Sequence, residues 1–136
     1  MPCPYFEPQR VVANSRYSNA RLPLIHEYEG VCHAKAAPEN APEALRFRYC
    51  NHGYSRGACE CFPAAETRSC LRYTVVRRTA TILEFICVEE QDHAPLRWQT
   101  LEYVLASGEL SPEIGELCMR AQALAFCRSY LKQFSE

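Results

Sequence analysis

The stretch that most constrains this chain runs from Cys50 to Pro63 and reads Cys-Asn-His-Gly-Tyr-Ser-Arg-Gly-Ala-Cys-Glu-Cys-Phe-Pro. It contains three cysteines, one histidine and two glycines, and it lacks the apolar period of a helix or a strand. We therefore expect a loop, and a loop so rich in thiols needs a reason for its shape. Thiolates gathered on a bound metal would supply that reason.

Length, charge and cysteine usage limit the kind of protein this can be. A chain of 136 residues with 48% hydrophobic side chains can bury one core, so we predict a single domain over 1–136. The net charge of -1 gives no general attraction to nucleic acid or anionic membranes. We find neither a signal peptide nor a membrane-spanning apolar stretch, and we expect a cytoplasmic protein. In a reducing cytosol, nine cysteines are not expected to form a disulfide framework.

The first part of the chain, residues 1–63, is predicted to be a loop-rich metal-binding region. Residues 1–20 carry three prolines, which favours an extended arm over a helix. A short helix is expected from Pro42 to Tyr49, with Asn51 or Gly53 adopting the left-handed conformation at its end.

The second part, residues 64–136, changes character. Residues 69–79, 81–89 and 96–105 are rich in β-branched and aromatic residues and predict a three-stranded antiparallel meander. Ser111-Pro112-Glu113 is a strong helix start, and the helix should reach Gln133. Its apolar arc is wider than one sheet face needs, so part of it should meet the N-terminal arm or a second subunit in a homodimer. The predicted fold class is α+β.

The nine cysteines separate into two groups by their sequence environment. Four of them lie within predicted strands or the C-terminal helix, where a cysteine usually serves as a small buried apolar residue; these are Cys70, Cys87, Cys118 and Cys127. The other five lie near proline or glycine in the non-periodic half of the chain. Among these we favour Cys3, Cys32, Cys50 and Cys59 as metal ligands, with Cys61 in reserve.

The spacing of these cysteines favours an iron–sulfur cluster. Structural zinc sites usually draw paired ligands from short knuckles with two to four residues between them, and no cysteine pair here has that spacing. A larger cluster, such as [4Fe–4S], can collect thiolates from separate segments, and a proline after a ligand cysteine, as in Cys3-Pro4, occurs in ferredoxin ligand runs. Zinc remains the alternative.

Two histidines beside the proposed ligands, His33 and His52, could replace one thiolate, although a loop histidine facing solvent is the simpler interpretation. A cysteine nucleophile assisted by His52 is conceivable, but five clustered cysteines are better explained as ligands. We find no catalytic motif, and a non-enzymatic role is favoured: electron transfer, redox sensing or a structural module, with a redox or protein partner.

A binding module for single-stranded nucleic acid or for a protein is the alternative function. Arginines alternate with tyrosines through the middle of the chain, a composition typical of surfaces that bind single strands. The near-zero net charge instead favours an ordinary solvated face. The residues that would carry this alternative are Arg46, Arg48, Tyr54, Arg56 and Arg72.

Overall fold

The structure is a computed structural model that describes residues 2–15, 22–53, 59, 61, 70–91 and 94–134. Its described elements form two antiparallel sheets, short helical turns and one long helix, an α+β fold as predicted. No helix within the described residues is long and apolar enough to cross a membrane. In chain order the elements are β1 (Phe6–Val11), β2 (Tyr28–Cys32), β3 (Glu39–Asn40), α1 (Glu43–Leu45), η1 (Arg46–Asn51), β4 (Cys70–Arg78), β5 (Ile82–Gln91), β6 (Ala94–Val104), β7 (Glu109–Ser111) and α2 (Leu117–Gln133).

The N-terminal half contains a three-stranded sheet, in the order β1-β2-β3, where the sequence had predicted a proline-rich arm and loops. Strand β1 contains Pro8, which cannot donate a backbone hydrogen bond to the ladder. The register between β1 and β2 shifts between Pro8 and Arg10, and such an irregularity is where a strand tolerates proline. The prediction of an extended arm missed this pairing because its partner strand is distant in sequence.

The second sheet has four strands in the order β4-β5-β6-β7, one more than the predicted meander. The alternation of β6 places Leu101 and Tyr103 in the core, whereas Trp98 on the opposite phase is 68% exposed. Strand β7 was missed because Ser111 was assigned to the start of a helix.

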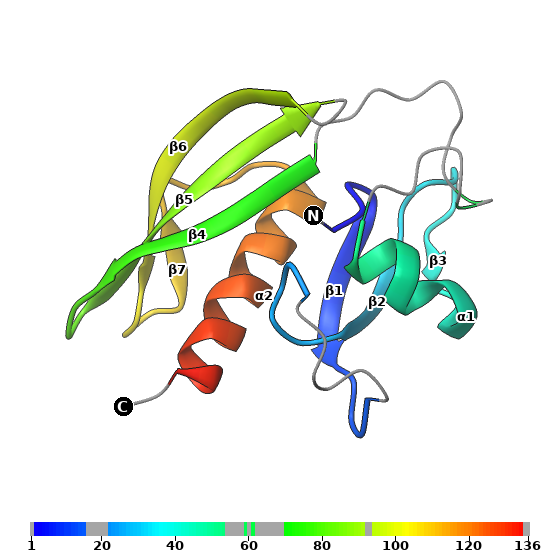
Figure 1. Ribbon diagram of the computed structural model, residues 1–136, viewed down its shortest axis with the longest axis horizontal. Helices are drawn as coiled ribbons and strands as arrows, with labels where there is room; N and C mark the ends of the chain where they lie inside the picture. Colours follow the sequence, from blue (N-terminus) through cyan, green and yellow to red (C-terminus); the bar gives the residue numbers. More distant parts are fainter. Residues whose placement is uncertain are drawn as a thin grey trace.

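Helix α2 lies between the two sheets (Figure 1). One face of the helix forms hydrogen bonds with the N-terminal half of the chain. Gln122 donates to the carbonyl oxygen of Cys3, and Ala125 and Ser129 are hydrogen-bonded to the Tyr28 hydroxyl on β2. A second face packs against the large sheet, where the ring of Phe126 stacks on Tyr73 at a centroid distance of 5.3 Å. The wide apolar arc therefore meets both the large sheet and the N-terminal segment, the first of the two partners expected for it, while Leu117 and Phe134 stay exposed.

The start of α2 differs from the prediction. Ser111 ends β7, its bond to Pro112 is cis, and the helix begins only at Leu117. The capping residue is Glu116, whose carboxylate accepts a hydrogen bond of 2.6 Å from the backbone N–H of Met119. The Ser-Pro-Glu signature failed here because Ser111 pairs with Glu102 on β6, a long-range contact that local helix signals do not contain.

The short predicted helix before Cys50 is present in a different form. Three α-helical residues pass into the π-helical segment η1, so Tyr49 does not end the helix. Asn51 lies inside η1 and is buried rather than left-handed, whereas Gly53 has a φ of +100°. A π-helical turn is rare and often marks a functional site.

Two buried tyrosines provide a test of the core around α2. The Tyr73 hydroxyl is buried and has no hydrogen-bond partner among the described residues, whereas the Tyr28 hydroxyl donates to the carbonyl oxygen of Ala125 at 3.0 Å. Removing the unsatisfied hydroxyl in Tyr73→Phe should raise the free energy of unfolding by about 1 kcal/mol. Tyr28→Phe should lower it by about 1 kcal/mol, because a buried acceptor loses its donor. Urea unfolding curves compare the two variants, and a loss of stability in both would contradict this description of Tyr73.

Candidate metal centre

Five cysteines line one small apolar cavity of about 20 Å³, and they are the five that the sequence separated from the core cysteines. They come from four places in the chain. Cys3 precedes β1, Cys32 ends β2 and Cys50 lies in η1, while Cys59 and Cys61 lie between η1 and β4. The structure therefore brings together all four favoured ligands and the reserve cysteine.

Three of these cysteines are buried and are fixed by the backbone. The N–H of Cys3 donates to the carbonyl oxygen of Cys50 at 3.0 Å. Cys32 pairs with Phe6 across the β1–β2 ladder, three residues beyond Cys3. Cys59 and Cys61 are more accessible, with intermediate burial. The cavity is thus lined by three buried cysteines and by two that are more accessible.

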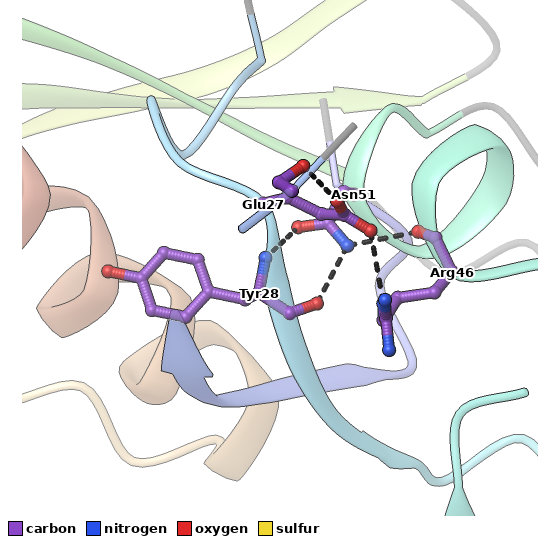
Figure 2. Close-up of polar contacts among 5 residues, drawn as sticks. Glu27, Tyr28, Arg46 and Asn51 are labelled. Carbon is purple, nitrogen blue, oxygen red and sulfur yellow. Dashed lines mark hydrogen bonds and ion pairs between the residues drawn. The ribbon is translucent and has the colours of Figure 1, made fainter. Parts of the chain in front are cut away.

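Asn51 attaches the Cys50 segment to β2 (Figure 2). Its side-chain oxygen accepts from the backbone N–H of Tyr28 at 2.7 Å, and its side-chain nitrogen donates to the carbonyl oxygens of Tyr28 and Arg46, both at 2.9 Å. Asn51 is 1% exposed, so each of these bonds is shielded from water. Because Asn51 follows Cys50 directly, this clamp sets the distance between Cys50 and the strand that carries Cys32.

Gln122 performs a similar role for Cys3 from helix α2. Its side-chain nitrogen donates to the carbonyl oxygens of Cys3 at 2.8 Å and Phe6 at 2.9 Å. The residue is 2% exposed. The turn that carries Cys3 is therefore attached to the long helix. Sequence reasoning gave Asn51 only a role in ending the short helix and did not single out Gln122, since an isolated buried amide leaves no sequence signal that distinguishes it from a surface one.

The thiols influence each other electrostatically. Burial raises the pKa of Cys50 well above its usual value, and the neighbouring Cys3 and Cys32 raise it further. Without a metal, Cys50 is thus a neutral thiol. An activated cysteine nucleophile requires a lowered pKa, so the alternative of Cys50 as a nucleophile loses support.

A lysine that the sequence analysis did not single out, Lys35, lies close enough to Cys61 for their charges to interact. Lys35 pairs with Glu39 at 3.4 Å, and this hydrogen bond is the main reason that its pKa is raised, with the charge of Cys61 adding to the effect. The Lys35 ammonium group in turn opposes the rise in the pKa of Cys61 that burial causes. A positive charge near several thiolates would help to balance their charge.

The two reserve histidines have other contacts. The Nε2 atom of His33 lies 2.8 Å from a carboxylate oxygen of Glu7, and both side chains are about one-fifth exposed. His52 is exposed and its ring lies near that of Phe47, with centroids 6.3 Å apart. Neither histidine lines the cysteine cavity.

The cavity contains enough cysteines to ligate a metal, but their side chains are not arranged around a common centre. Among the residues described, no group of three or more His, Cys, Asp or Glu side chains is arranged to hold a metal ion. A cavity of about 20 Å³ is close to the volume that one water molecule needs. Binding would require the thiols to turn toward a common centre, a step that commonly accompanies metal binding in small domains.

Comparison with protein-family models, with curated proteins and with solved structures gives no match. The function must therefore be argued from the residues themselves.

The remaining cysteines lie apart from this cavity. Cys87, Cys118 and Cys127 are at most 4% exposed within the core, and Cys70 is half-buried on β4. Burial raises the pKa of both Cys87 and Cys127 to about 12, as expected of thiols among apolar neighbours. These three buried cysteines match the packing role that the sequence predicted for them.

Of the arginines predicted for nucleic-acid binding, the three that the structure describes lie on two separate elements, η1 and β4. Arg46 and Arg48 line a groove beside η1, whereas Arg72 lies on β4 and pairs with Glu90 at 3.4 Å. Arg77 is paired in the same way with Glu84. Tyr54 and Arg56 lie outside the described residues. Pairing with carboxylates reduces the positive potential that a nucleic-acid surface needs, which weakens this alternative.

Proposed function

We propose that this protein is a small metalloprotein whose centre is held by Cys3, Cys32, Cys50 and Cys59, with Cys61 as the reserve ligand. The single observation that supports this is the convergence of five cysteines from four separate parts of the chain on one cavity. Cys3 and Cys50 are part of the buried core cluster, but Cys59 and Cys61 are more accessible, so core packing does not account for all five. Two buried amides and a backbone bond between Cys3 and Cys50 hold this arrangement.

The favoured centre is a [4Fe–4S] cluster. Ligands from dispersed segments suit a cluster that takes one thiolate on each of its four iron atoms. The two more accessible cysteines would give the cluster one edge near the surface. An electron can then reach a partner protein by a short path, which favours electron transfer or redox sensing over a purely structural module.

Zinc is the second candidate, and the size of the cavity favours it. A volume of about 20 Å³ has room for one ion, whereas a cubane requires the cavity to widen. Four thiolates at about 2.3 Å would complete a closed tetrahedral site of the structural kind. In that case the protein would be a zinc-stabilised module that binds a protein partner.

Metal analysis of protein purified without oxygen distinguishes the two candidates. We expect about four iron and four acid-labile sulfide per chain for a cubane, together with visible absorption that dithionite bleaches. About one zinc per chain, with neither iron nor sulfide, would support the second candidate. Protein that is folded and contains neither metal after expression with both supplied would refute the proposal.

A further inference from the structure

A groove of about 930 Å³ is lined by described residues and is distinct from the cysteine cavity. One wall is the turn after β1, residues 12–15, and the other is formed by residues 43–49 of α1 and η1. Asn14 has a φ of +55°, which turns the chain at the rim of the groove. The volume lies within the range of pockets that bind small molecules.

A buried carboxylate lies in this groove. Glu27 is 6% exposed. The Ser15 hydroxyl donates to one of its carboxylate oxygens at 2.5 Å, and Nε of Arg46 donates to the other at 3.0 Å. Since each oxygen already accepts a hydrogen bond and the charge is balanced by Arg46, Glu27 is suited to orient the arginine and not to bind a cation.

The orientation of Arg46 leaves the outer half of its guanidinium group available. Only Nε is used by Glu27, and the two terminal nitrogens have no partner among the described residues. Figure 2 shows the end of the guanidinium directed away from Glu27. The side chain is 16% exposed, so these donors are largely shielded from water yet reach the groove. A guanidinium group fixed in this way can bind an oxyanion through two parallel hydrogen bonds.

A second arginine completes the arrangement. Arg48 also lines the groove, is exposed and has no partner among the residues described. The groove carries two arginines and two glutamates, Glu27 and Glu43, so its formal charges balance. Recognition would therefore depend on directed hydrogen bonds more than on long-range attraction.

We propose that this groove binds a small molecule through a phosphate or carboxylate group held by Arg46 and Arg48. Glu27 is a positioning residue that fixes Arg46. This site does not depend on the proposed metal centre, although Tyr49 lines both cavities.

Titration of the full chain with inorganic phosphate, and separately with acetate, at constant ionic strength tests the proposal by NMR. We expect saturable shifts around the groove with a Kd for phosphate of about 1 mM. Arg46→Lys keeps a cation beside Glu27 but loses the two parallel donors, so the Kd should rise about tenfold. A lower Kd for phosphate than for acetate would identify a phosphate site, and a lower Kd for acetate would identify a carboxylate site.

Two further variants keep the test decisive. Arg48→Gln changes an exposed side chain without a partner among the described residues, so it should fold normally and weaken binding about threefold. Arg72 lies on β4, away from the groove, so the Arg72→Lys variant should bind phosphate with the same Kd as the unchanged protein. The absence of saturable binding up to about 20 mM, or equal weakening by the Arg72 and Arg46 variants, would overturn the proposal.

Discussion

Replacing Cys50 by serine is expected to reduce the metal content of anaerobically purified protein at least about tenfold. Cys50 is buried and connects two of the cysteine segments. Its carbonyl oxygen accepts a hydrogen bond from the N–H of Cys3, and its neighbour Asn51 is hydrogen-bonded to Tyr28 on β2. A serine hydroxyl is a poor substitute for a thiolate toward iron or zinc. Iron, sulfide and zinc analysis measures the loss, and circular dichroism shows how far the N-terminal half loses order with it.

Cys127→Ser is the matched control for this change. Cys127 is 0% exposed, so the replacement also introduces a hydroxyl into a buried site, at a cost of about 1–3 kcal/mol in the free energy of unfolding. Its metal content should equal that of the unchanged protein. Equal loss of metal from both variants would mean that the loss follows from destabilisation and not from a missing ligand.

Replacing Gly30 by alanine is expected to lower the free energy of unfolding by about 3 kcal/mol or more. A Cβ atom at this position would lie 2.0 Å from the backbone oxygen of Glu7 and 3.0 Å from the Cα atom of Pro8. Neither atom belongs to a side-chain tip that could move aside, so the two strands must separate. Because β1 and β2 carry the segments of Cys3 and Cys32, we also expect less metal to be bound. Urea unfolding and metal analysis measure the two effects.

Gly115→Ala provides the control for the glycine change. A Cβ atom there has no neighbour within 4 Å, and Gly115 lies just before α2. Its stability should stay within about 0.5 kcal/mol of the unchanged protein. If Gly30→Ala changed the free energy of unfolding as little as this control does, the close approach of β1 to β2 would be disproved.

The small sheet and helix α2 act together as the support for the cysteine cavity. Asn51 connects η1 to β2, and Gln122 connects α2 to the turn that carries Cys3. Both amides are buried with their hydrogen bonds formed, which makes them rigid connections in a low-dielectric setting. These connections hold the backbone segments of Cys3, Cys32 and Cys50 in place, while their side chains would still have to turn toward a common centre to bind a metal.

The sequence alone separated the five cysteines that line the cavity from the other four. Local signals separated them, because the five lie near proline and glycine outside the periodic segments, whereas Cys87, Cys118 and Cys127 follow the apolar pattern of a strand or helix. The α+β class and the regions of β4, β5, β6 and α2 were predictable for the same reason, since each is long and strongly patterned.

Only the tertiary structure revealed the small sheet, strand β7, the late start of α2 and the clamps around the cavity. Asn51 bonds a strand 23 residues away, and Gln122 reaches 116 residues back to Phe6. Such contacts depend on which segments the fold brings together, and the sequence around an amide side chain does not tell whether it is buried or exposed. Local periodicity thus predicted β4, β5, β6 and the body of α2 and separated the two groups of cysteines, while long-range hydrogen bonding decided how the cysteine segments are held together.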